Sequence, residues 1–199
     1  GREMAEIYIG FVDTPGLFAF LIRKVIRQRY VHVVLGFDSG LEEAYSVGRR
    51  FPEIPLIAGF EKEDRQRILN QFPTAHYQIC SICCTDEQKN ELKLAAEEAY
   101  KNRMRYHYTV LGLPFLLIGK AFYQKNHYTC SSWLARTTQE AGVYEWDRHF
   151  SLVTPREVYQ AMGKDSLRGE LVFEGRLEEL VHQGSKREWR AALSGALYR

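Results

Sequence analysis

The chain has no long apolar run and almost no excess of charge of either sign. Its longest apolar run, residues 110–118, contains Pro114 and is far shorter than the roughly 20 residues that a membrane-spanning helix needs. The 27 basic and 25 acidic residues leave a net charge of +2, without the clustered basic excess typical of nucleic-acid-binding domains. We therefore expect no membrane span and no nucleic-acid partner.

Cysteine is also scarce. The chain has 4 cysteines, of which Cys80, Cys83 and Cys84 are crowded together and Cys130 is remote. This is not the pattern of a disulfide-stapled secreted domain. Residues 2–6 show no basic-then-apolar signal peptide. A reducing, cytoplasmic location is the simplest expectation, and composition leaves the oligomeric state open.

The mixture of expected strands and helices favours an α+β fold without a strict βαβ rhythm. Hydrophobic residues make up 45% of the 199 residues, enough for one domain with a buried core. We expect this domain over residues 5–164, followed by a charged, helical appendage over residues 165–199. The residue pattern predicts strands over 6–12, 30–37, 41–47, 75–84 and 171–174, and helices over 17–26, 61–70, 86–103, 130–141 and 154–162.

Capping residues, a proline and a glycine in the sequence predict where several helices begin or end. Thr85 with Gln88 forms a capping-box pattern, and Thr154 followed by Pro155 is typical of a helix start. Gly142 is expected just beyond the end of the 130–141 helix.

Cys130 is the first candidate for chemistry because it stands where that helix begins. A thiol at a helix N-terminus meets unpaired backbone N–H groups and the positive end of the helix dipole. Both favour the thiolate, which is the nucleophilic form. Ser131, beside it, keeps the helix start polar. The alternative is an inert buried thiol, since free cysteines are often core residues.

His32 is the candidate general base because a histidine within a valine-rich strand needs polar partners. A catalytic imidazole is oriented by a third polar group. The turn at residues 38–40 leads into a strand that carries Glu42 and Glu43, and we expect it to pair alongside His32. Side-chain alternation allows one of the two glutamates to face the ring.

The order of these motifs resembles a known family. A strand starting with His32 and Val33, a following strand with Glu43 and Ala44, and much later a helix starting Cys130-Ser-Ser-Trp look like the circularly permuted papain-like hydrolases, the permuted NlpC/P60 superfamily, and in particular its YiiX/YaeF-like group. Lecithin:retinol acyltransferase-like proteins and deSUMOylase-like peptidases share the permuted order more distantly. Many members carry glycine where this chain has Val34.

The resemblance covers roughly residues 5–160 and implies an antiparallel sheet packed against helices. It assigns Cys130 as nucleophile, His32 as base and Glu43 as orienting residue. It implies a cysteine hydrolase or acyltransferase that acts on a peptide, isopeptide or acyl-lipid carbonyl and needs no cofactor. A non-catalytic lipid- or peptide-binding module on the same fold is the alternative.

Other residues are candidates for substrate contacts. Tyr108 or Tyr123, in the aromatic stretch before the Cys130 helix, is placed to donate to an oxyanion, although core packing is the simpler role. Arg49 and Arg50 follow the glutamate strand and are candidates for binding a carboxylate or phosphate.

A zinc site built from His76 and the crowded cysteines is the remaining alternative. We do not expect a metal there, because on a strand Cys80 and Cys83 point to opposite faces.

Overall fold

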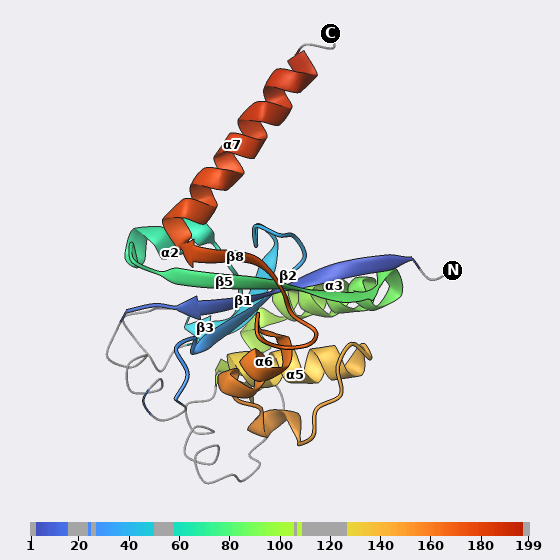
Figure 1. Ribbon diagram of the computed structural model, residues 1–199. Helices are drawn as coiled ribbons and strands as arrows, with labels where there is room; N and C mark the ends of the chain where they lie inside the picture. Colours follow the sequence, from blue (N-terminus) through green and yellow to red (C-terminus); the bar gives the residue numbers. More distant parts are fainter. Residues whose placement is uncertain are drawn as a thin grey trace.

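The fold is α+β and is built on a six-stranded antiparallel sheet with strand order β4-β3-β2-β1-β5-β8 (Figure 1). The computed structural model describes residues 3–15, 24, 27–49, 58–105, 107–108 and 127–196. The six strands are β1 Met4–Asp13, β2 His32–Gly36, β3 Ala44–Arg49, β4 Ala58–Lys62, β5 His76–Thr85 and β8 Glu170–Arg176. A separate short parallel pair joins β6 His107–Tyr108 to β7 His127–Tyr128.

Helices cover both faces of the sheet. Figure 1 shows α3, α5 and α6 below the sheet, α2 above it, and α7 extending away from it. The described helices are α2 Arg65–Gln71, α3 Asp86–Lys101, α5 Cys130–Glu140, α6 Pro155–Met162 and α7 Leu177–Ala196, with 3₁₀ turns at η1 Arg103–Arg105 and η2 Phe150–Leu152. Among these residues, no helix combines the length and apolar character needed to cross a bilayer.

The helix ends that local chemistry predicts are confirmed. Thr85 and Gln88 form a reciprocal capping box at the start of α3, and Thr154 caps α6 with Pro155 in its first turn. Gly142 follows α5 with a φ of 72°, a conformation that glycine adopts without steric cost.

Alternation along the strands divides the core into two layers. Val33 and Leu35 of β2 belong to a large apolar cluster with α3, α5 and α6. Val34, between them, belongs to a second cluster with Leu177 and Leu180 of α7. The sheet is therefore buried on both faces, which fixes the register of β2, because a shift by one residue would exchange its two faces.

The structure departs from the sequence prediction at strand β4. Residues 61–62, expected to begin a helix, end strand β4, and the helix starts at Arg65, after the N-cap Asp64. Residues 171–174, predicted as a strand within the appendage, lie in the edge strand β8, which pairs with β5. The appendage therefore supplies one strand of the sheet. The helix expected over 17–26 and most of the aromatic stretch 106–123 lie outside the described residues.

Phe60 links the sheet to the helix that carries Cys130. It is fully buried, and its ring packs edge-to-face on Trp133 of α5, with centroids 4.7 Å apart. Phe60→Ala is expected to lower the free energy of unfolding by about 3–5 kcal/mol, because it removes apolar contacts and leaves a cavity. Urea unfolding measures this change. Leu171→Ala, at a side chain 46% exposed on the edge strand, is the control and should cost less than about 1 kcal/mol. Equal losses for the two variants would contradict this account of the core.

Candidate active site

Cys130 is the first residue of α5, and the cap of this helix holds it in place. The Thr129 hydroxyl accepts a hydrogen bond from the Ser132 N–H (3.1 Å), and the Ser132 hydroxyl accepts one from the Thr129 N–H (2.8 Å). The first intrahelical bond runs from the Trp133 N–H to the Thr129 carbonyl. The N–H of Cys130 therefore precedes the helical ladder, as expected for the first helical turn. The Cys130 residue is 5% exposed.

His32 lies beside this thiol at the first position of β2. The Cys130 Sγ is 3.9 Å from the carbonyl oxygen of Val31, the residue before His32. The side chains of Cys130 and Glu63 both act electrostatically on the His32 ring. Its Nε2 is 3.1 Å from Glu63 Oε1 and 3.2 Å from Ser46 Oγ.

Glu63 is the carboxylate that contacts the imidazole, and it comes from the residue after β4. Its backbone N–H donates to the Ala44 carbonyl (2.8 Å), which extends the β3–β4 pairing by one residue. Ser46 of β3 donates its hydroxyl to the same Glu63 Oε1 that faces His32. The Glu63 side chain is 12% exposed. Three adjacent strands thus supply the imidazole, the hydroxyl and the carboxylate.

The electrostatics of the site favour a charged imidazole. Burial lowers the pKa of His32, but hydrogen bonds and charge from Cys130 and Glu63 outweigh burial and raise the pKa to about 10. Burial raises the pKa of Glu63, yet its hydrogen bonds to His32 and Ser46 and the charge of His32 bring the pKa below its ordinary value. Both shifts favour an imidazolium–carboxylate pair at neutral pH.

The expectation that Glu42 or Glu43 contacts His32 is wrong. The turn at Asp38 brings the Glu43 carbonyl to the N–H of Phe37, five residues along the chain from His32, or about 16 Å at 3.3 Å per strand residue. Glu43 instead pairs with Lys93 (3.3 Å), and Glu42 pairs with Arg65 (3.3 Å). In an antiparallel hairpin the residues next to the turn pair with each other, so His32, at the open end, lies far from both glutamates.

The structure describes only some of the predicted substrate-contact residues. Ser131 is 1% exposed, and its hydroxyl lies 3.3 Å from that of Thr129, inside the helix start. Arg49 ends β3 and Tyr108 ends β6, but their side chains lie outside the described part of the structure. Arg50 and Tyr123 lie outside the described residues altogether.

The crowded cysteines belong to strand β5, as predicted. Cys80 and Cys84 are buried, and Cys83, on the other face, is exposed. Burial raises the pKa of Cys80 to about 12, and its thiol donates to Gln78 Oε1 (3.4 Å). His76 instead hydrogen-bonds to the hydroxyl of Tyr30 (3.1 Å). Across the described ranges, no three His, Cys, Asp or Glu side chains gather as a metal-ligand set.

Comparison of the chain with protein-family models, with curated proteins and with solved structures found no match. The geometry of the site therefore carries the functional argument by itself.

The site makes stability depend on pH through His32. The pKa of His32 rises from an ordinary 6.5 to about 10 on folding. Its stabilising contribution is thus fully present below pH 6.5 and is lost as the pH rises through about 10. Glu63→Gln removes the carboxylate, so it should lower the pKa of His32 and bring this loss of stability to lower pH. Histidine NMR titration and urea unfolding between pH 6 and 10 measure the two effects.

Glu43→Gln is the matched control for this experiment. It removes a carboxylate of the same size that pairs with Lys93 and not with His32. Its His32 titration should follow that of the parent protein. Equal shifts in the two variants would overturn the assignment of Glu63 as the partner of His32.

Proposed function

We propose that this protein is a cysteine-dependent hydrolase or acyltransferase in which Cys130 is the nucleophile, His32 the acid–base residue and Glu63 the residue that orients His32. The observation that carries the proposal is His32: its Nε2 lies 3.1 Å from Glu63 Oε1, the Cys130 Sγ approaches the carbonyl of the preceding residue at 3.9 Å, and both Cys130 and Glu63 raise the pKa of His32. A nucleophile, a base and a group that orients the base form the minimal set for covalent acyl transfer.

The charge state of His32 suits thiol chemistry. With its pKa raised to about 10, His32 is an imidazolium at neutral pH, and an imidazolium next to a thiol stabilises the thiolate. Glu63, whose pKa is lowered, supplies the carboxylate that keeps this imidazolium charged. Ser46 holds Glu63 through a hydrogen bond, so the ring is oriented by a pair of polar groups and not by a single flexible side chain.

The reaction follows from these positions. The Cys130 thiolate attacks a carbonyl carbon, and the C–S bond forms as the carbonyl electrons move to oxygen. As the tetrahedral adduct collapses, the bond to the leaving nitrogen, oxygen or sulfur breaks, and His32 gives its proton to that atom. Neutral His32 then takes a proton from water or another acceptor as it attacks the thioester, and Cys130 leaves as the thiolate.

The start of α5 offers a place for the negative charge that develops on the carbonyl oxygen. The Cys130 N–H precedes the first intrahelical hydrogen bond, and the helix N-terminus adds partial positive charge. A backbone donor next to the nucleophile is a common part of an oxyanion hole. The nearly buried thiol strengthens such electrostatic effects by limiting its contact with water.

The proposed fold is the permuted papain-like one. Its support is the chain order, in which a strand histidine comes first, a carboxylate on the sheet second and a helix-starting cysteine last. The sheet is antiparallel and packs against that helix, as the resemblance implies. The third residue is Glu63 in place of Glu43, and it directly follows β4, the third strand of the β2–β3–β4 meander. The substrate is proposed to be a peptide, isopeptide or acyl-lipid carbonyl.

An acyl thioester probe tests the proposed chemistry directly. In a Cys83→Ala background, which removes the exposed thiol, intact-mass spectrometry should detect one acyl group added, and peptide mapping should place it on Cys130. Cys130→Ala should abolish the adduct. His32→Ala should slow its formation by at least about 100-fold, the range typical of general acid–base catalysis.

Glu63→Gln should slow acylation, and the control Glu43→Gln should not change it. Undiminished acylation of Cys130→Ala would overturn the proposal. Ligand binding without any acylation of folded parent protein would favour the alternative, a non-catalytic binding module.

A further inference from the structure

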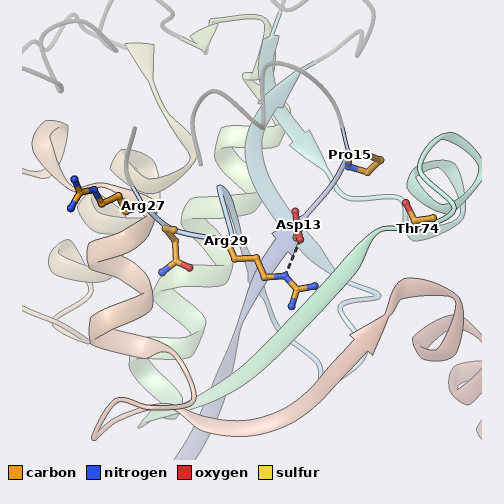
Figure 2. Close-up of a pocket in the computed structure, with 6 residues that line it drawn as sticks. Asp13, Pro15, Arg27, Arg29 and Thr74 are labelled. Carbon is orange, nitrogen blue, oxygen red and sulfur yellow. Dashed lines mark hydrogen bonds and ion pairs between the residues drawn. The ribbon is translucent and has the colours of Figure 1, made fainter. Parts of the chain in front are cut away.

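A pocket of about 530 Å³ opens at the end of the sheet where β1 ends and β2 begins (Figure 2). Its lining residues are Asp13, Pro15, Arg27, Gln28, Arg29 and Thr74. Figure 2 shows Arg29 reaching toward Asp13, with Pro15 and Thr74 on one side and Arg27 on the other, its guanidinium directed away from Arg29. The proposed acyl-transfer chemistry assigns this pocket no role.

Hydrogen-bond donors dominate the lining. The Arg29 Nε donates to Asp13 Oδ2 (2.9 Å), which leaves its two Nη groups as donors, and its guanidinium lies over the Tyr30 ring, 5.4 Å from the centroid. The Gln28 Oε1 accepts from the Tyr30 N–H (3.4 Å), so the Gln28 amide NH₂ remains a donor. Arg27 makes no ion pair with any described residue.

Cationic side chains outnumber acidic ones among the described lining residues, where Arg27 and Arg29 are cationic and Asp13 is acidic. Glu174 of β8, which is not a described lining residue, also acts electrostatically on Arg29. The Asp13 contact fixes the guanidinium of Arg29. A guanidinium held in place, in a pocket that a second arginine and neutral donors also line, is suited to a carboxylate or a phosphate.

The pocket lies at the end of the sheet where β2 begins with His32. Val12 pairs with His32, so Asp13 lies one residue beyond this pair, next to Val31. The carbonyl of Val31 is the group that the Cys130 Sγ approaches at 3.9 Å. Arg29 precedes His32 by three residues, so their Cα atoms are at most about 11 Å apart. A short acyl chain spans such a distance between an anionic end group at Arg29 and a carbonyl near His32.

We infer that this pocket binds an anionic group, a carboxylate or a phosphate, on the substrate whose carbonyl Cys130 attacks. The inference rests on the proposed function and narrows its substrate class to acidic acyl compounds. Arg27 and Arg29 are specificity residues in this account, and Asp13 is the positioning residue that holds Arg29.

Three phenyl thioesters with the same hexanoyl-length acyl chain test the inference. They end in a carboxylate, a phosphate monoester or a neutral carboxamide, and the readout is the rate of Cys130 acylation in the Cys83→Ala background. We expect an anionic thioester to react at least about tenfold faster than the carboxamide. The faster of the two anionic thioesters shows which anion the pocket prefers.

Substitutions in the pocket distinguish its effect on anion selectivity from the acylation reaction itself. Arg27→Gln and Arg29→Gln should each reduce the advantage of the anionic thioester and leave the carboxamide rate unchanged. Asp13→Ala, which removes the carboxylate that holds Arg29, should reduce this advantage as well. Arg190→Gln, which removes an exposed arginine from α7, is the charge-matched control. Equal rates for all three thioesters, or equal slowing of all three by Arg29→Gln, would overturn the inference and leave the proposed function standing.

A binding measurement is independent of acylation. Titration with inorganic phosphate and with succinate should shift the Arg29 Nε–H resonance saturably in the parent protein and in Cys130→Ala. Saturable binding by a protein that never acylates would refute the proposed function and retain the anion pocket. The absence of a saturable shift with either anion would refute the pocket, whatever the result of the acylation experiment.

Discussion

The pairing of His32 with Glu63 is the interaction on which the rest of the site depends. The Nε2–Oε1 contact of 3.1 Å both orients the ring and favours its charged form. Burial by itself lowers the pKa of His32, and interactions with Cys130 and Glu63 raise it above its ordinary value. In the proposed mechanism the charged ring donates a proton to the leaving atom, and the nearby helix N-terminus favours negative charge on the Cys130 sulfur.

Three consecutive strands and one helix bring His32, Glu63 and Cys130 together. The β2–β3–β4 meander runs back and forth across one half of the sheet, so the imidazole, the Ser46 hydroxyl and the Glu63 carboxylate come from neighbouring strands. Helix α5 packs on these strands through Trp133 and Phe60, and its cap fixes the start of the helix at Cys130. A loss of packing between Phe60 and Trp133 would therefore move the thiol relative to the ring, although neither aromatic residue takes part in the chemistry.

Sequence reasoning identified the parts of this site that local chemistry determines. Thr154 and Gly142 mark helix ends through hydrogen bonding and backbone freedom within a few residues, and His32 is conspicuous as a polar residue in an apolar strand. Glu63 was missed because its position depends on the register between β3 and β4, which no local signal specifies. The error over Glu43 is different: a tight turn at Asp38 already requires Glu43 to pair near Phe37, so hairpin geometry excludes a contact with His32.

The reactivity of the Cys130 thiol tests the central claim most directly. The rate of carbamidomethylation of Cys130 by iodoacetamide at pH 7, followed by peptide mass spectrometry, reports the nucleophilicity of this residue alone. If the pair of His32 and Glu63 activates the thiol, His32→Ala and Glu63→Gln will each slow this reaction by at least about tenfold, and Glu43→Gln will leave it unchanged. An alkylation rate that is the same in the parent protein, His32→Ala and Glu63→Gln would contradict the account.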